Sequence, residues 1–343
     1  MVIALLISVA VAFVTTFSII PNLIKFLYAA GVVGLDLNKQ KKPTVPSSGG
    51  IAVALGIIAG LLVYIGIQTF AYSQSSLTLL AVTASVLLAV FVGFFDDLNI
   101  KRERVRTNEG YDIRVGIPRR FKPLLTLPAA VPLMVISVGE TTLSLPILGD
   151  VNFGILYPLL LVPIGIVGAS NMVNMLGGHN GLEAGMSFIY MVSLGLYSLI
   201  FLGINSSVIF FISAAAILPF LKYNWFPAKI LPGDSLTYLL GSLVAGGVIV
   251  GNLEKIGIVV MLPFIIQGAL KFYSKMKLGY YASDLGVVGR NGIVKSKYGK
   301  NIFSLTHLVM NLGNFTEKQI TIVLIIIQIS FGLLPFILQP YWL

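Results

Sequence analysis

Long apolar segments recur along the whole chain and constrain its fold more than any other feature. Each is close to the ~20 residues that a transmembrane helix needs. Only 10% of the residues are charged, whereas about a quarter are charged in a typical soluble domain. Because lipid admits only helices and closed barrels, we expect an all-α polytopic membrane protein, with residues 1–343 forming a single integral domain. About ten transmembrane helices are predicted, near residues 3–26, 49–70, 77–95, 123–138, 152–170, 186–203, 206–221, 235–251, 256–273 and 319–338.

Basic residues are distributed unevenly between the connections. If successive loops alternate sides, 22 of the 23 Lys and Arg lie on one face of the membrane, and Lys255 is the exception. The positive-inside rule makes that face cytoplasmic and places the N- and C-termini outside. The net charge of +10 therefore reflects topology, so we expect no nucleic-acid partner. The same charges would attract anionic lipid headgroups or a phosphorylated substrate.

The scarcity of some residue types excludes several functions. The chain has no Cys and only two His, His179 and His307, so neither thiolate chemistry nor a His-rich metal site is expected. Ten of the 13 Asp and Glu lie in loops assigned to the cytoplasm. No predicted span has an acidic residue near its middle, which disfavours a proton-coupled transporter or an ion channel. The chemistry is therefore expected at the cytoplasmic rim.

Two connections carry signals for small β-hairpins. The extracytoplasmic segment GETTLSLPILGD (139–150) alternates apolar and polar residues between turn residues. In the cytoplasmic segment GVVGRNGIVKSK (286–297), an Asn-Gly pair separates two short apolar runs. We expect one hairpin in each segment.

Asp96 and Asp97 stand side by side at the end of the third apolar segment. Adjacent helical residues point about 100° apart, so both carboxylates cannot face lipid. A carboxylate at a helix C-terminus is also disfavoured by the helix dipole. We therefore favour a functional role at the membrane boundary. The alternative is a pair of rim charges that bind Lys101 or Arg102.

The stretch NMVNMLGGHNGLEAGMS (171–187) is unusually polar for a turn between two spans. Its glycines permit positive φ and close approach of a ligand to backbone N–H groups. Asn side chains can contact a nucleobase or supply oxygen to a metal. The alternative is a tight turn with Asn caps, and we interpret His179 as a polar loop residue rather than a ligand.

Two further stretches add a carboxylate and a basic cluster to the same face. Asp234 opens a span, and its alternative role is an ordinary helix N-cap. The stretch PRRFKPLL (118–125) contains Arg119, Arg120 and Lys122, which the positive-inside rule alone would explain. Carboxylates, amides and cations facing one compartment suit a Mg²⁺–pyrophosphate site. Phosphoryl transfer requires mainly positioning and charge neutralisation, which such a site supplies.

These motifs resemble those of the polyprenyl-phosphate N-acetylhexosamine-1-phosphate transferase family (glycosyltransferase 4 type), and most closely its dolichyl-phosphate N-acetylglucosamine-1-phosphotransferase branch. The resemblance covers nearly the whole chain and implies ten spans, outside termini and a cytoplasmic active-site cleft. It rests on four ordered stretches: GLDLNKQKKPTVPSSGG (34–50), GFFDDLNI (93–100), NMVNMLGGHNGLEAG (171–185) and NWFPAKILPGDSLTYLLG (224–241).

The resemblance also implies a reaction. A polyprenyl or dolichyl phosphate oxygen attacks the β-phosphorus of UDP-N-acetylglucosamine (UDP-GlcNAc), UMP leaves, and a sugar-diphosphate lipid stays in the bilayer. The reaction would depend on Mg²⁺, with Mn²⁺ as an alternative, and would begin lipid-linked glycan assembly. Direct attack is favoured over a covalent aspartyl intermediate because the metal site already neutralises charge.

Matched residue by residue, the resemblance assigns roles to the polar positions. It implies catalytic roles for Asp96, Asp97, Lys122 and Asp234, and Mg²⁺ ligation by Asn174 and Asp234. Glu183 would orient the site, and Arg290 would reach the diphosphate or the sugar. The implied substrate-binding residues are Leu37, Asn38, Gly178, Asn180, Gly181, Glu183 and Arg290.

The sequence departs from the family pattern at two places. Ser47 and Ser48 stand where the first loop of the family often has an acidic residue. The segment before Lys122 is longer than in eukaryotic relatives, so Arg119 or Arg120 could hold the phosphate instead.

Several alternatives remain open from the sequence alone. The sugar could be another UDP-N-acetylhexosamine or UDP-muramoyl-pentapeptide, with loop 274–318 setting the choice. The resemblance implies a His cluster in this loop for the peptidoglycan branch, so the absence of His from residues 274–300 favours GlcNAc over muramoyl-pentapeptide. A lipid flippase or transporter is the alternative from another class. The composition favours an archaeal-type plasma-membrane protein, and the resemblance suggests a homodimer.

Overall fold

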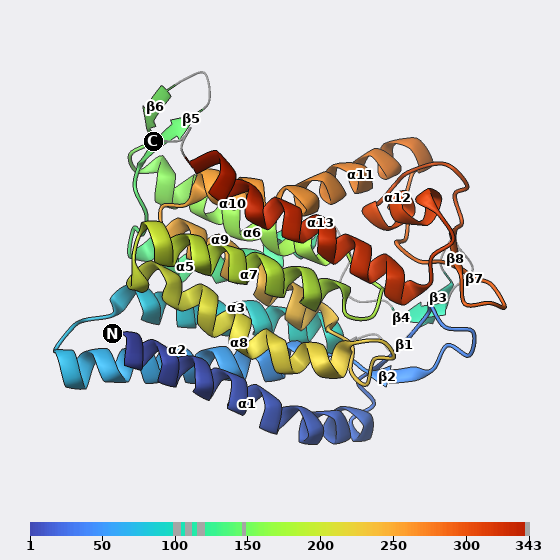
Figure 1. The fold of residues 1–343 in the computed structure, drawn as a ribbon, viewed down its shortest axis with the longest axis horizontal. Coiled ribbons are helices and arrows are strands. Elements are labelled where there is room, and N and C mark those ends of the chain that lie inside the picture. Colours follow the sequence, from blue (N-terminus) through green and yellow to red (C-terminus); the bar gives the residue numbers. More distant parts are fainter. Residues whose placement is uncertain (99–103, 107–111, 115–120, 146–148, 340–343) are drawn as a thin grey trace.

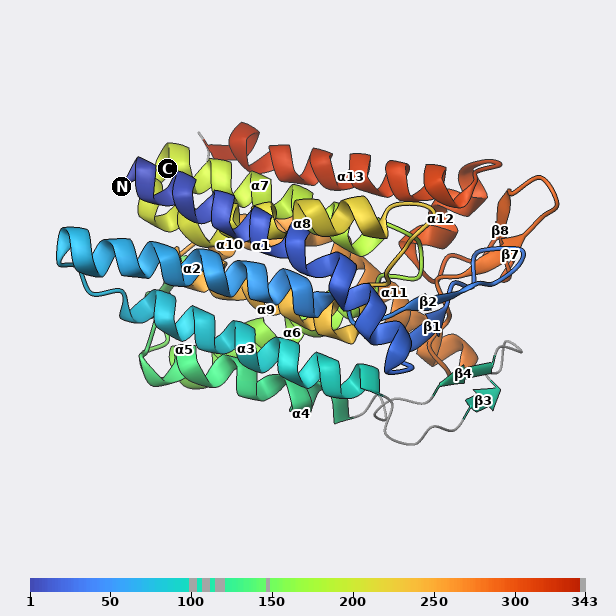
Figure 2. The same ribbon diagram turned by 90° about the horizontal axis from the view of Figure 1, so that it is seen from below.

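The computed structural model describes residues 1–98, 104–106, 112–114, 121–145 and 149–339. Within these ranges the chain forms a bundle of helices that run along the long axis of the molecule (Figures 1 and 2). Short 3-10 and π-helical segments, η2 (Leu127–Ala130) and η3 (Tyr157–Leu161), extend two of the helices. The helices are α1 (Val2–Ala29), α2 (Gly50–Tyr72), α3 (Leu77–Leu98), α4 (Lys122–Thr126), α5 (Val131–Val135), α6 (Val162–Asn174), α7 (Leu182–Phe201), α8 (Ile204–Asn224), α9 (Gly233–Val250), α10 (Glu254–Val260), α11 (Leu262–Leu278), α12 (Leu305–Leu312) and α13 (Glu317–Leu338).

The structure confirms a mostly helical, polytopic architecture. Each of the ten predicted spans overlaps helical segments. Within the described residues, eight helices are long and apolar enough to cross a membrane, or nine if α10 and α11 form one broken span. The fourth predicted span, 123–138, is divided into α4, η2 and α5, and this stretch is too short to count among the eight. Pro128 and Pro132 each remove a backbone donor there, which explains the division.

The predicted ninth span is bent by 63° between α10 and α11. Pro263 stands in the first turn of α11 and lacks the N–H that would continue the helix. Gln328 of α13 donates from Nε2 to the carbonyl oxygen of Val260 at 2.9 Å. A side chain from another helix thus satisfies a backbone acceptor at the bend, as a membrane interior requires.

Helix α9 is the centre of the bundle. Its membrane-spanning window is 78% buried, compared with 33% for α1 and α13. Gly50 of α2 and Gly93 of α3 contact its first turn so closely that an added Cβ would lie under 3.0 Å from the backbone of residues 234–236. Small residues commonly permit such close helix contacts in membranes. The start of α9, where Asp234 stands, is therefore fixed by two neighbouring helices.

Among the described residues, four antiparallel hairpins lie at the ends of the bundle. The expected hairpins are confirmed: β5 (Thr142–Leu145) pairs with β6 (Gly149–Asn152), and β7 (Gly286–Val288) pairs with β8 (Val294–Ser296). Two further hairpins were not predicted. They are formed by β1 (Val33–Leu35) with β2 (Thr44–Pro46), and by β3 (Arg104–Arg106) with β4 (Asp112–Arg114).

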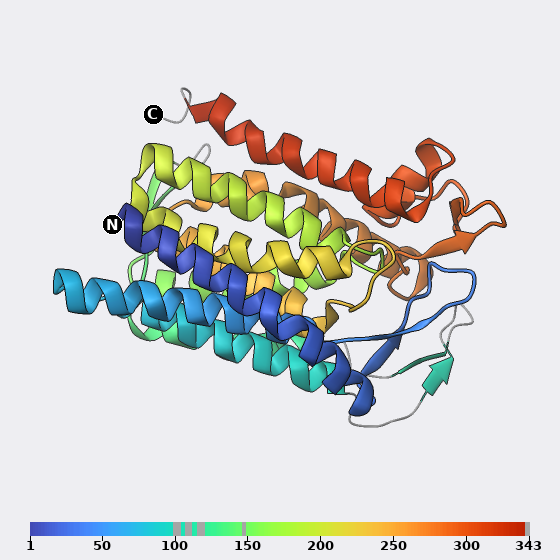
Figure 3. The same cartoon turned by 60° about the horizontal axis from the view of Figure 1, so that its bottom comes forward.

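The hairpins distinguish the two ends of the molecule. The start of α1, the end of α13 and β5–β6 lie at one end, and the other three hairpins lie at the opposite end (Figures 1 and 3). This arrangement agrees with the predicted assignment of residues 139–150 and both termini to the same side.

Candidate active site

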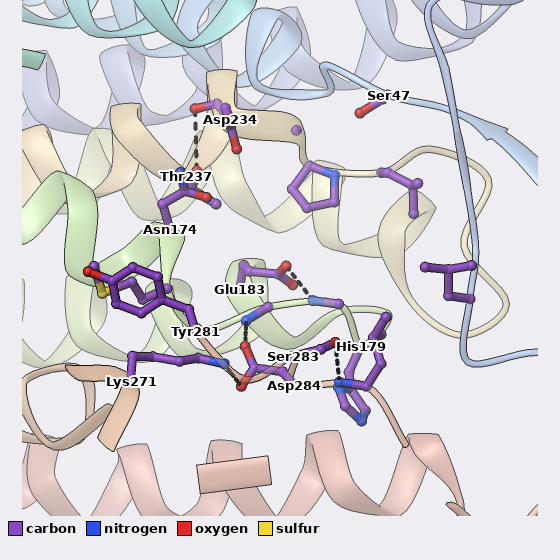
Figure 4. A pocket seen from close by; sticks show the side chains of 18 of the residues that line it. Ser47, Asn174, His179, Glu183, Asp234, Thr237, Lys271, Tyr281, Ser283 and Asp284 are labelled. Atoms are coloured by element: carbon purple, nitrogen blue, oxygen red, sulfur yellow. Dashed lines mark hydrogen bonds and ion pairs between the residues drawn. The ribbon is translucent and has the colours of Figure 1, made fainter. Parts of the chain in front are cut away.

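A cavity of about 820 Å³ lies at the end of the bundle that carries β1–β2 and β7–β8. Asp234 and Thr237 of α9 lie on one side of it, and Lys271, Tyr281 and Asp284 lie on the opposite side (Figure 4). The predicted site residues that line it are Leu37, Lys122, Asn174, Gly178, Asn180, Glu183 and Asp234. The structure therefore brings together residues from five separate parts of the sequence.

Lys122 lines the cavity and lies between two carboxylates. Its Nζ is 2.7 Å from Oδ2 of Asp96 and 2.6 Å from Oδ2 of Asp234. The hydroxyl of Tyr238 donates to Asp96 at 3.2 Å. Asp96 is buried, so its charge needs this pairing. Lys122 is one of three candidates for holding the phosphate, and it lines the cavity. The other two, Arg119 and Arg120, lie outside the described residues.

Asp97 holds the start of α9. Its carboxylate accepts the backbone N–H groups of Asp234 at 2.7 Å and Ser235 at 3.1 Å. The hydroxyl of Ser48 donates to the same carboxylate at 2.8 Å. Gly233 has φ +69°, and a Cβ on it would collide with the Asp97 carboxylate. A carboxylate at position 48 would face Asp97, which gives a physical reason for a hydroxyl there.

Asp97 therefore accepts the backbone N–H groups at the start of α9. This is the N-cap role that was considered as an alternative for Asp234. The residue at the cap position of α9 is Pro232, and it makes no side-chain capping bond. The Asp234 carboxylate instead pairs with Lys122 and lines the cavity. The alternative role of Asp234 as an ordinary N-cap is thus not what the structure shows.

The glycine-rich segment is held by Glu183. Its Oε1 accepts the N–H of Gly178 at 3.1 Å (Figure 4). Gly178 and Gly181 have φ +89° and +78°, a conformation that favours glycine. A Cβ on Gly181 would also collide with the ring of Trp225. Glu183 therefore holds the backbone of the loop at Gly178, which lines the cavity.

The first loop joins the same assembly through Asn38. Its Nδ2 donates to the carbonyl of Gly178 at 2.8 Å, and its Oδ1 accepts from Gly286 at 3.4 Å. Asn38 is buried behind the cavity, whereas Leu37 lines it. Asn38 thus connects two loops, and Leu37 is the neighbour placed to meet a ligand.

Asn38, Asp96, Asp97 and Gly181 do not line the cavity themselves but contact residues that do. Arg290 does not line it either. It is exposed in the turn between β7 and β8, where its carbonyl accepts from Gln40. The segment Tyr280–Leu285 lines the cavity instead. Within it, Asp284 pairs with Lys271 at 2.7 Å.

Sequence reasoning missed Lys271 and Asp284. Lys271 stands near the end of a predicted span, where the positive-inside rule already explained it. Asp284 lies in a loop with no motif around it. Asp284 also accepts from Gln267 at 2.9 Å and from the N–H of Gly177 at 3.4 Å, so it ties α11 to the glycine-rich segment. These hydrogen bonds of Asp284 join residues far apart in the sequence, so only the structure reveals them.

His179 differs from the expected polar loop residue because it is buried, with 2% of its surface exposed. Burial lowers its pKa to about 4, against an opposing effect of Asp284. Neither ring nitrogen has a hydrogen-bond partner among the described residues. The imidazole is therefore neutral near pH 7.

Asn174 and Asp234, the metal ligands that the resemblance implies, both line the cavity. In the part of the chain that the structure describes, no group of three or more His, Asp or Glu could hold a metal by itself. Mg²⁺ usually takes one or two carboxylates and completes its shell with water and substrate phosphate. The carboxylate of Asp234 and the amide oxygen of Asn174 fit that requirement, and the ammonium of Lys122 already shows that the position attracts a cation.

Comparison with known proteins assigns the family. The model of the family described as glycosyl transferase family 4 matches residues 79–252, a range that contains the Asp pair, Lys122, the glycine-rich segment and Asp234. A protein of Saccharolobus solfataricus is 33% identical over 342 residues, which cover 98% of this chain and 95% of that protein. This chain belongs to glycosyl transferase family 4.

The family relatives carry related names. The Saccharolobus protein is provisionally named UDP-N-acetylglucosamine–dolichyl-phosphate N-acetylglucosaminephosphotransferase. A Dictyostelium discoideum protein with that name is 28% identical, covering 91% of this chain and 83% of its own. A phospho-N-acetylmuramoyl-pentapeptide-transferase of Halalkalibacterium halodurans is 27% identical, covering 98% of both. The resemblance inferred from the motifs is thereby confirmed, and the chain is a phosphotransferase of this family.

Proposed function

We propose that the protein transfers GlcNAc 1-phosphate from UDP-GlcNAc to a polyprenyl phosphate of the dolichyl type and releases UMP. The observation that carries this proposal is the position of Lys122 between Asp96 and Asp234, at the wall of a polar cavity at one end of an apolar bundle. A membrane-bound phosphate and a water-soluble nucleotide can meet only at such a boundary. Relatives named for this reaction support the choice of substrates.

The residues of the cavity can divide the chemistry between them. A new bond forms between a lipid phosphate oxygen and the β-phosphorus, and the bond from that phosphorus to the bridging oxygen breaks. The bridging oxygen and its electron pair leave with UMP. Lys122 would neutralise phosphate charge, with Asp96 and Tyr238 holding its ammonium in place. Asp97 would keep Asp234 in position by fixing the start of α9.

A divalent cation would complete the charge balance. Asp234 and Asn174 would hold Mg²⁺, or Mn²⁺ in its place, and the ion would neutralise the diphosphate of the nucleotide. The ammonium of Lys122 would then be free to leave Asp234 for a phosphate oxygen.

The uridine and the sugar of the donor substrate would bind against different residues of the cavity. Leu37, Gly178, Asn180 and Gly181 belong to the loops that would hold the uridine. The sugar would bind against Lys271, Tyr281 and Asp284, because these residues face Asp234 across the cavity (Figure 4). Arg290 would need movement of the β7–β8 turn to contribute.

The charge distribution supports a cytoplasmic active site. The cavity lies at the end that carries the basic loops, opposite both termini. By the positive-inside rule that end faces the cytoplasm, across an archaeal-type plasma membrane. Accessibility of single introduced cysteines to a membrane-impermeant reagent would test this sidedness, since the chain has no Cys of its own.

The reaction is tested by UMP release from purified protein supplied with UDP-GlcNAc, a polyprenyl phosphate and Mg²⁺. Release that requires both the lipid and the metal, and that EDTA abolishes, would support the proposal. Release only with UDP-muramoyl-pentapeptide or another UDP-sugar would change the substrate, as the bacterial relative suggests. No release with any UDP-sugar would contradict it and favour a lipid-handling protein without turnover.

A further inference from the structure

Asn180 is held at three of its four hydrogen-bonding groups. Its backbone N–H donates to Oε1 of Glu317 at 2.9 Å, and its carbonyl accepts from Thr321 at 3.2 Å. Its side-chain Nδ2 donates to Oδ2 of Asp36 at 3.0 Å. Asn180 has 4% of its surface exposed, yet it lines the cavity. The group left over is the amide oxygen, Oδ1, which has no hydrogen-bond partner among the described residues.

Lys39 explains why two buried carboxylates can lie beside Asn180. Its Nζ is 3.1 Å from Asp36 and also pairs with Glu317. It lies 4.5 Å from the centre of the Phe226 ring as well. Asp36 and Glu317 are both more than 95% buried, so this ammonium supplies the charge that they need.

The chemistry of Asp36 fixes which end of the Asn180 amide faces it. A carboxylate paired with an ammonium only accepts hydrogen bonds, whereas an Asn amide has one donor end and one acceptor end. The donor end must therefore face Asp36. The acceptor end is then the only part of the side chain available to a ligand in the cavity.

We propose that Asp36, acting through Asn180, makes the cavity selective for a base that carries an N–H at the position Asn180 contacts. Uracil has such a donor at N3, whereas cytosine has an acceptor there. This inference rests on the proposed function, in which the donor substrate is a uridine diphosphate sugar. Two acceptors facing each other in a buried site leave both unpaired, so cytosine is rejected. Asp36 is a positioning residue, since it acts on the orientation of Asn180.

The experiment compares the binding of UDP and CDP to purified protein by calorimetry. The wild type is expected to bind UDP more tightly. In Asp36→Asn, residue 36 can either donate to or accept from Asn180, so the amide can present either end. The UDP-to-CDP affinity ratio is then expected to fall by about tenfold or more. If the wild-type protein binds UDP and CDP with equal affinity, the proposed function itself is contradicted.

Glu317→Gln is the matched control. It removes the other carboxylate of the same cluster, but that carboxylate contacts the backbone of Asn180 and does not orient its side chain. It is expected to weaken UDP and CDP binding by similar factors and to keep their ratio. An equal loss of selectivity in this variant would contradict the proposal, because it would indicate general loosening of the loop.

A reciprocal exchange provides a second test that preserves the charge of the cluster. In the double variant Asp36→Asn with Asn180→Asp, the new amide donates to the new carboxylate, whose second oxygen presents an acceptor to the cavity. Its UDP-to-CDP ratio is expected to be close to that of the wild type. If the double variant lacks UDP preference, or if Asp36→Asn alone keeps the wild-type ratio, the proposal is wrong. Should Asp36→Asn fail to fold, the double variant decides the question by itself.

Discussion

At the scale of single residues, the two adjacent aspartates have different tasks. Asp96 holds the ammonium of Lys122, and Asp97 holds the backbone of α9. The sequence showed that both must face something polar, since adjacent helical side chains diverge. It did not show which partner each one has, because those partners come from other helices.

Ser48 provides a direct test of the Asp97 contact. Ser48→Ala removes one hydrogen bond and is expected to cost about 1 kcal/mol of stability. Ser48→Asp places a second buried carboxylate against Asp97 and is expected to cost several times more. Thermal unfolding in detergent measures both. Equal midpoints for the two variants would contradict the proposed contact.

His179 provides a test of the buried loop. Its pKa is lowered to about 4 in the folded protein, from 6.5 in the unfolded chain. As pH falls below 6.5 the unfolded chain binds the proton first, so stability is lost between about pH 6.5 and 4 and no further below that. The loss is up to about 3 kcal/mol.

The measurement is the unfolding midpoint of wild type and His179→Gln at pH 7.5 and 5. The variant is expected to lose less stability than the wild type between these values. Identical losses would mean that His179 does not contribute to acid sensitivity.

At the scale of elements, the contact between α3 and α9 positions the carboxylates. Gly93→Ala would push a methyl group into the backbone of Asp234 and Ser235. We expect a destabilisation on the order of 1–3 kcal/mol and a large loss of turnover, because Asp97 would no longer reach the start of α9.

Gly66→Ala is the matched control for this prediction. Gly66 lies within α2, and an added Cβ there would meet nothing within 4 Å. This variant is expected to be neutral or stabilised by up to about 1 kcal/mol, since alanine favours a helix. Similar behaviour of Gly93→Ala and Gly66→Ala would show that the α3–α9 contact is unimportant.

The bend between α10 and α11 also influences the site, because it sets the direction of α11. It directs α11, which carries Gln267 and Lys271, toward the cavity. Gln328→Leu would leave the carbonyl of Val260 without its donor. An interhelical hydrogen bond of this kind contributes about 0.6–2 kcal/mol in membranes, so turnover is expected to fall by up to about tenfold together with the melting temperature. Ile329→Ala, on the exposed face beside it, is the control that should retain activity.

At the scale of the whole molecule, the sequence predicted the parts that depend on local patterns. Apolar segments of about 20 residues predicted the long helices. An Asn-Gly pair predicted the β7–β8 hairpin. The motifs also placed Asp234, Asn174 and the glycine-rich segment on one side.

Several of the unpredicted features of the site depend on contacts between distant residues. Lys39 and Glu317 are 278 positions apart, yet they meet beside Asn180. The bend at α10–α11 was missed because the mostly apolar segment 256–273 predicts one continuous span, although Pro263 lies within it. Lys271 was missed because a basic residue near a span end has an ordinary topological explanation, and Asp284 was missed because no motif surrounds it.

The central claim is that phosphoryl transfer takes place where Lys122, Asp96 and Asp234 meet, with Asp97 holding α9. The most direct measurement is the turnover of Asp97→Asn and Asp234→Asn, assayed as lipid-dependent UMP release and normalised to protein whose thermal unfolding shows that it is folded. Both variants are expected to lose turnover by about a hundredfold or more, the scale of removing a preorganised charge contact. Folded variants that both retain near-normal turnover would contradict the assignment of this cavity as the active site.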